Sequence, residues 1–77
     1  MEVERLVKMA NDIGSFFESD KDTERGAKGI ADHIRMFWPP RMRREILAHL
    51  DAGNGSGLNP LVLDALRTHV DELKPNS

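Results

Sequence analysis

The sequence has no cysteine, no tyrosine and a single tryptophan among its 77 residues. Without cysteine the chain has no disulfide, no thiolate metal site, no iron–sulfur ligand and no cysteine nucleophile. It also lacks any apolar run near the ~20 residues that a membrane-spanning helix needs. Its first ten residues, MEVERLVKMA, carry acidic groups early and contain no apolar signal core. We therefore expect a soluble, cytoplasmic protein with no membrane partner.

The chain is short and slightly acidic. Its formal net charge is −2, and charged residues of both signs make up 31% of it, which disfavours a general polyanion binder. The length suffices for one small domain, so we predict a single domain over residues 1–77. A domain of this size buries only about 60% of the surface of its unfolded chain. Its stability should be marginal, and a bound partner would increase it.

Hydrophobic spacing predicts an all-α fold, a small four-helix domain with short links. Apolar residues recur at i, i+3, i+4 and i+7, the pattern of a helix that buries one face. The expected helices span about 3–18, 22–37, 40–52 and 60–73, separated by polar or glycine-rich stretches such as SDKDT and GNGSG. The predicted core positions are Val3, Leu6, Val7, Ala10, Ile13 and Phe17; Ala27, Ile30, Ala31 and Ile34 with Phe37 or Trp38; Met42, Ile46, Leu47 and Leu50; and Val62, Leu66, Val70 and Leu73.

Prolines and capping residues predict where these helices begin and end. The pair Pro39–Pro40 should end the second helix, because proline disfavours the helical conformation of the residue before it. Pro40 then suits the first turn of the third helix, where a missing N–H costs nothing. Asn59 is the expected N-cap of the fourth helix, with Pro60 as its first residue. Gly14 is expected where a neighbouring helix packs closely.

The stretch Ile30–Arg44, IADHIRMFWPPRMRR, holds the only tryptophan, the double proline and a cluster of arginines. The four aromatic residues of the chain form two pairs, Phe16–Phe17 and Phe37–Trp38, each at the predicted end of a helix. Neighbouring residues point about 100° apart on a helix, so only one ring of each pair can face the core fully.

We predict that the corner around the double proline binds a partner protein, with the indole and several guanidinium groups facing outward. Tryptophan and arginine are frequent hot-spot residues at interfaces, and arginine suits bidentate, partly desolvated ion pairs. Arg41 and Arg44 should share a face of the third helix, and Arg43 should point elsewhere. The alternative is a solvated basic face that caps the preceding helix. The predicted partner-binding residues are His33, Arg35, Phe37, Trp38, Arg41, Met42, Arg43 and Arg44.

No pattern predicts a catalytic, cofactor-binding or metal-binding residue. The histidines His33, His49 and His69 form no i, i+4 pair and no HExxH motif. GNGSG lacks both a lysine and a preceding strand, so it is not a phosphate loop. A small hydrolase is disfavoured because no nucleophile–base pair is visible. A nucleic-acid-binding helical module remains an alternative, weakened by the acidic balance of the chain.

Three blocks of the sequence resemble one known family. They are LVKMANDIGSFF (Leu6–Phe17), GIADHIRMFWPPRMRR (Gly29–Arg44) and GLNPLVLDALRTH (Gly57–His69). In order and at this spacing, they resemble the delta subunit of soluble, NAD-dependent molybdenum formate dehydrogenases. The central block is the most specific of the three. The acidic link at residues 19–25 and the tail after His69 match least well.

The resemblance implies a non-catalytic accessory subunit that stabilises a formate dehydrogenase complex or assists its assembly and molybdenum-cofactor insertion. The complex would oxidise formate to carbon dioxide and reduce NAD. The large catalytic subunit, the implied partner, would carry the molybdenum bis-guanine-dinucleotide cofactor and Fe–S clusters, and other subunits FMN and the NAD site. No cofactor is expected on this chain. A transient maturation factor for the same enzyme is the alternative reading.

Overall fold

The structure is a computed structural model that describes residues 2–75. These residues form helices and connecting turns and contain no strand, which confirms the predicted all-α fold. The helices are α1 (Val3–Phe17), α2 (Thr23–Phe37), α3 (Pro40–Gly53), α4 (Pro60–Thr68) and α5 (Val70–Leu73).

The prediction of one continuous helix over 60–73 is wrong. The chain breaks at His69, whose φ of −110° and ψ of 24° lie outside the helical range, and α5 restarts at once. The interruption falls in Thr68–Val70, three consecutive residues of modest helix propensity. Tertiary packing also favours the break between α4 and α5. After the break, Leu73 is fully buried in the core, and α5 contacts α2.

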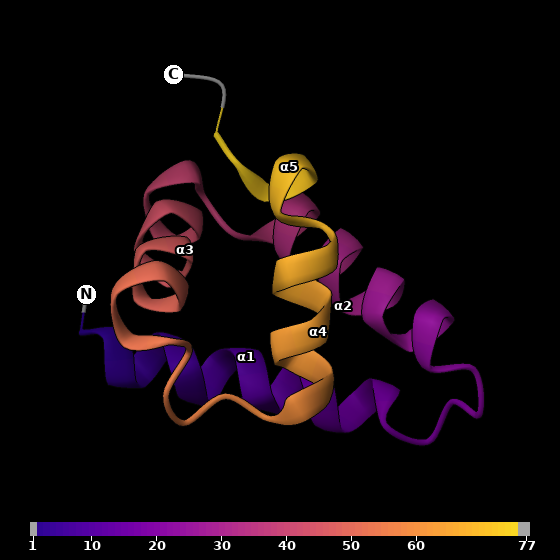
Figure 1. Cartoon of the computed structure of the whole chain (residues 1–77). Helices are drawn as coiled ribbons and strands as arrows, with labels where there is room; N and C mark the ends of the chain where they lie inside the picture. Colours follow the sequence, from indigo (N-terminus) through magenta and orange to yellow (C-terminus); the bar gives the residue numbers. More distant parts are fainter. Residues whose placement is uncertain (1, 76–77) are drawn as a thin grey trace.

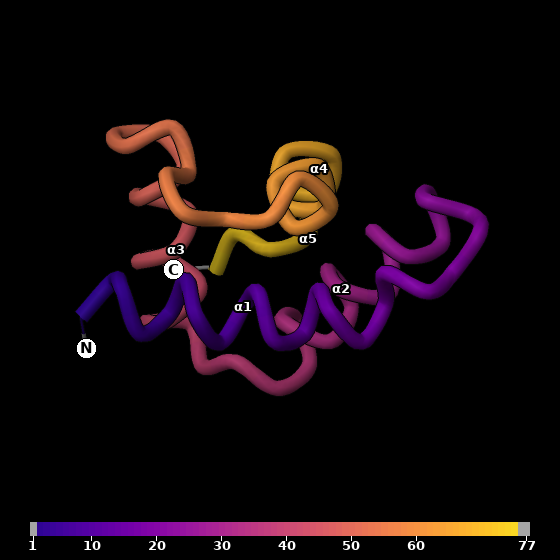
Figure 2. The backbone as a smooth tube through the Cα atoms, turned by 90° about the horizontal axis from the view of Figure 1, so that it is seen from below, coloured from indigo at the N-terminus to yellow at the C-terminus, as the bar shows by residue number. Residues whose placement is uncertain are grey.

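The helices cross rather than lie side by side in one bundle. In Figure 1, α1 runs along the bottom, while α3 and α4 stand across it and α2 rises obliquely behind α4. Figure 2, seen from below, shows α4 nearly end-on above α1, with α3 to one side. The closest associations are α2 with α4 and α1 with α2. In Figure 2 the turn between α2 and α3 lies at the lower edge of the molecule.

One hydrophobic core joins all five helices, and most predicted core positions reach it. Leu6, Ile30, Ile34, Ile46 and Leu66 are each 0% exposed. Val3 is an exception at 36% exposure, because it sits in the first turn of α1 at the margin of the fold. The partly buried residues that pack against this core include Val7, Ile13, Phe17, Met42, Leu50 and Val70.

Side-chain hydrogen bonds fix two helix starts in different ways. The Asp22 carboxylate caps α2 and accepts from the backbone N–H groups of Glu24 and Arg25 at 3.0 and 3.2 Å. Asn59 occupies the N-cap position of α4 as predicted, but its side chain does not cap the helix. Instead, Asn11 on α1 clamps this link. Its amide donates to the Gly57 carbonyl at 2.9 Å, and its oxygen accepts from the Asn59 N–H at 2.8 Å.

Two glycines allow close helix contacts, and the sequence indicated the one at Gly14. A Cβ atom on Gly14 of α1 would lie 2.5 Å from a methyl carbon of Val62 on α4. A Cβ atom on Gly29 of α2 would lie 2.4 Å from the ring of Phe17 at the end of α1. Both distances are far below van der Waals contact, so glycine lets α1 approach α4 and lets the Phe17 ring lie directly on α2.

Candidate docking surface

The double proline makes the corner between α2 and α3, as predicted. The Trp38 N–H donates to the Ile34 carbonyl at 2.9 Å, which closes α2, and Trp38 itself is extended with φ −89° and ψ 132°. The Pro39 carbonyl accepts from the N–H groups of Met42 and Arg43 at 3.0 and 3.2 Å, which starts α3. The chain turns sharply here without glycine, so few backbone conformations are open to it.

The prediction that the indole projects outward is wrong. Trp38 is only 6% exposed and belongs to the hydrophobic core. Because its backbone has left the helical region, its side chain no longer follows the 100° step from Phe37. A large ring contributes much apolar area, so burying it suits a domain with a small core. Trp38 supports the corner from beneath and offers a partner little surface.

The surface above Trp38 is formed by the last turn of α2. Phe37 is 66% exposed and Met36 is 65% exposed. The imidazole of His33, one turn earlier, lies against the Phe37 ring with 4.7 Å between ring centroids and 43° between planes. We call these three side chains the α2 ridge. Met36 was missing from the predicted site. The sequence indicated its exposure, because Ile34 occupies the buried face of α2 and a residue two positions later points to another face.

The arginines of the corner divide as the sequence predicted. Arg41 and Arg44 are exposed, whereas Arg43 is half-buried. The Arg43 guanidinium donates to the Leu73 carbonyl at 3.5 Å and so connects α3 to the end of α5. Its Nε atom is buried and has no hydrogen-bond partner among the described residues. Arg43 therefore has a structural role in this fold. Arg35 makes a long ion pair of 3.8 Å with Asp32.

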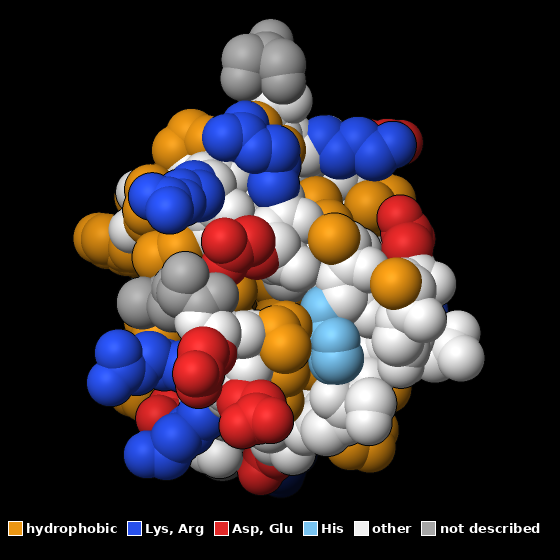
Figure 3. All heavy atoms as spheres, turned by 90° about the vertical axis from the view of Figure 1, so that its left-hand side faces the viewer, with side chains coloured by type: hydrophobic (Ala, Val, Ile, Leu, Met, Phe, Trp, Pro, Cys, Tyr) orange, Lys and Arg blue, Asp and Glu red, His pale blue; other side chains and the backbone are white. Residues whose placement is uncertain are grey.

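A shallow hollow of about 350 Å³ lies at the start of α3. Met42 contributes part of its lining and also packs against the core. The hollow begins two residues after Phe37, at the same corner. In Figure 3, which looks onto the side that carries α3, hydrophobic and Lys or Arg side chains lie next to one another along the upper left. The hollow is lined by Pro39, Arg41, Met42 and Glu45.

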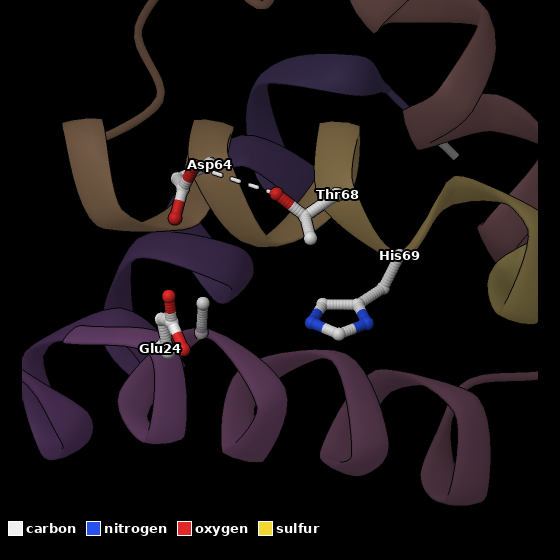
Figure 4. A pocket seen from close by; sticks show the side chains of 5 residues that line it. Glu24, Asp64, Thr68 and His69 are labelled. Atoms are coloured by element: carbon white, nitrogen blue, oxygen red, sulfur yellow. Dashed lines mark hydrogen bonds between the residues drawn. The ribbon is translucent and has the colours of Figure 1, made fainter. Parts of the chain in front are cut away.

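A second concave region, the α2–α4 cleft, has a volume of about 490 Å³ (Figure 4). Its lining includes Glu24, Asp64, Thr68 and His69. The Thr68 hydroxyl donates to Asp64 at 3.4 Å, and the figure shows no contact between this hydroxyl and the imidazole. In this cleft the Thr68 hydroxyl therefore contacts a carboxylate and not the imidazole.

The imidazole in this cleft belongs to a hydrogen-bond network that holds α5 on α2. His69 Nδ1 lies 2.6 Å from the Glu72 carboxylate, whose other oxygen accepts from Lys28 Nζ at 2.9 Å. The Lys28 ammonium lowers the pKa of the Glu72 carboxyl, and Glu72 in turn raises the pKa of Lys28. All three groups are thus engaged in the fold. Among residues 2–75, no group of three or more His, Cys, Asp or Glu side chains could hold a metal ion.

Fold and surface together define a small all-α protein with an exposed apolar and basic corner. In the described part of the chain, no helix is long and apolar enough to cross a membrane. The chain belongs to the formate dehydrogenase delta-subunit family, since the family model for the NADH-dependent formate dehydrogenase delta subunit FdsD matches residues 5–66. This confirms the resemblance seen in the sequence. Neither the curated proteins nor the solved structures include a match.

Proposed function

We propose that this chain is a non-catalytic accessory subunit of a cytoplasmic, NAD-dependent molybdenum formate dehydrogenase. It docks on the large catalytic subunit and thereby stabilises the complex or assists insertion of its molybdenum cofactor. The partner subunits, and not this chain, carry the molybdenum bis-guanine-dinucleotide cofactor, the Fe–S clusters, FMN and the NAD site. Family membership supports the link to formate dehydrogenase.

The observation that carries the docking proposal is the α2–α3 corner. Large exposed apolar side chains beside arginines are typical of interface cores. The buried Trp38 and the half-buried Arg43 fix the shape of this surface, and the exposed residues around them make the contact. Those contact residues are His33, Arg35, Met36, Phe37, Arg41, Met42 and Arg44.

Purification through a tag on the large subunit tests this proposal, from cells with and without the chain. We expect one copy of the chain for each large subunit. Without the chain, we expect a lower molybdenum content, a lower thermal midpoint of the complex, or both, with a matching loss of formate-dependent NADH formation. A complex with unchanged molybdenum content, stability and activity would contradict the proposal. Loss of molybdenum without stable association would favour a transient maturation factor instead.

A further inference from the structure

The α2 ridge is both exposed and held in a restricted conformation. Of the described residues, the exposed large hydrophobic ones are Val3, Phe16, Met36 and Phe37, and only the last two are neighbours. The His33 ring supports the Phe37 ring on one side. The double proline fixes the backbone directly after it. A side chain held in this way loses little conformational entropy on binding, which increases the affinity that a given buried area provides.

Arg41 gives this apolar surface a charge. Among residues 2–75, no carboxylate lies within ion-pair distance of its exposed guanidinium. Arg25 and Lys28 differ, because each is held by an internal carboxylate at 2.8 to 2.9 Å. Arg41 also lines the hollow, together with Pro39 and Met42. The corner thus presents an apolar ridge, an adjacent hollow and a cation that is not used within the fold.

Charge decides which partner fits. A phosphate backbone or an anionic membrane needs an array of cations. Here Glu45 lines the same hollow as Arg41, and Asp32 lies beside Arg35, so the corner is not uniformly basic. A protein surface that supplies one carboxylate and is otherwise apolar matches this pattern.

We propose that the counter-surface on the formate dehydrogenase complex is an apolar pocket with a carboxylate at its rim. Phe37 is the anchor that enters the pocket, Met36 and His33 seal its edge, and Arg41 pairs with the carboxylate. This inference rests on the proposed function and specifies the chemistry of its contact. Phe16 has no part in it, although Phe16 is even more exposed than Phe37, at 79%.

The test uses the formate dehydrogenase complex purified without this chain and immobilised, with the full-length chain added in solution. We expect Phe37→Ala to weaken binding by about 30-fold, as for a hot-spot aromatic, and Phe16→Ala by less than about threefold. Phe16→Ala is a matched control, because it removes an equally large ring from the end of another helix. Both rings are exposed, so both variants should keep the helical content and unfolding midpoint of the wild type.

Ionic strength separates the charge contact from the apolar one. We expect Arg41→Gln to weaken binding about fivefold at about 50 mM NaCl and much less at about 500 mM, because salt screens a pair at the rim. The loss for Phe37→Ala should be the same at both concentrations. Unchanged binding by Phe37→Ala, a larger loss for Phe16→Ala, or no effect of Arg41→Gln at low salt would overturn the inference while the proposed function stands. Failure of the wild-type chain to bind would instead count against the proposed function.

Discussion

Phe16–Phe17 and Phe37–Trp38 each close a helix, and in each pair the first ring is exposed while the second packs inward. Their second rings differ in depth. Phe17 lies half-buried over Gly29 at the edge of the fold, whereas Trp38 is part of the core. The first pair therefore covers a helix contact from outside, and the second supports a corner from within.

The charges that follow the two pairs differ as well. After Phe17, Asp20 accepts two hydrogen bonds from Arg25 at 2.8 and 2.9 Å, and Asp22 caps α2. These carboxylates serve the fold itself. After Trp38, the Arg41 guanidinium faces solvent without a partner among the described residues. An exposed phenyl ring alone is therefore a weak sign of docking, and the charge left beside it is the better guide.

Truncation of the inner ring of each pair should give the largest effect. We expect Trp38→Ala to lower the free energy of unfolding by about 3–5 kcal/mol, the range for large core aromatics, and Phe17→Ala by roughly half as much. Urea unfolding followed by circular dichroism measures both. Trp38 is the only tryptophan, so its blue-shifted emission in the native protein checks its burial directly. Equal losses in the two variants would remove the difference in depth that we describe.

Replacing Gly14 or Gly29 by alanine tests how rigid the packing is at each of these two helix contacts. In Gly14→Ala, the new Cβ meets fully buried Val62, and overpacking should exceed the gain in helix propensity, for a net loss of about 1–2 kcal/mol. In Gly29→Ala, the half-buried Phe17 ring can move toward solvent, so we expect a change within about 0.5 kcal/mol. Thermal unfolding compares the two variants. A greater loss at Gly29 would show that the outer contact is the more rigid.

The acidic link after Phe17 should give the smallest effect, visible mainly as pH dependence. Hydrogen bonds from Arg25 and from the Asp22 backbone lower the pKa of Asp20 from 3.8 to about 2. The folded-state pKa lies below the unfolded one. The resulting stabilisation is therefore present above about pH 4 and is lost as the pH falls toward 2. We expect Asp20→Asn to lose less stability than the wild type over that range.

Urea midpoints at about pH 7, 4 and 2.5 show this difference, within the range where the Asp20 carboxyl titrates. Asp12→Asn is the control, because Asp12 is exposed and makes no hydrogen bond or ion pair within residues 2–75. The Asp12 variant should keep the wild-type pH dependence. An Asp20 variant that did the same would mean that the link contributes nothing to acid stability.

The sequence predicted the elements of this fold well, because helix periodicity and proline are local signals. The stripe through Ile30 and Ile34, and the turn at Pro39–Pro40, follow from steric rules that act within a few residues. The break at His69 could not be predicted in this way. It depends on Leu73 being buried in the core while α5 contacts α2, which lies far from α5 in the sequence.

The candidate site was predicted only in part, for a similar reason. Its location and the separation of Arg41 from Arg43 follow from helix geometry. The burial of Trp38 does not, because an extended residue before proline has no fixed face, and only the surrounding helices decide where its ring lies. The omission of Met36 is a separate error, because Met36 lies within α2 and the helix periodicity that places Ile34 in the core also places Met36 on the surface. Whether the corner binds a partner stays a prediction.

The match to the family ends at residue 66, but the folded body does not. Leu73 lies beyond that limit and is fully buried, and the Leu73 carbonyl accepts from Arg43. A fragment cut at the family boundary would end inside α4, leave a hole where Leu73 sits and remove the carbonyl that Arg43 contacts. The region that matches the family is therefore shorter than the region that folds as one unit. Anyone who shortens or tags this protein should keep the chain intact through Lys74.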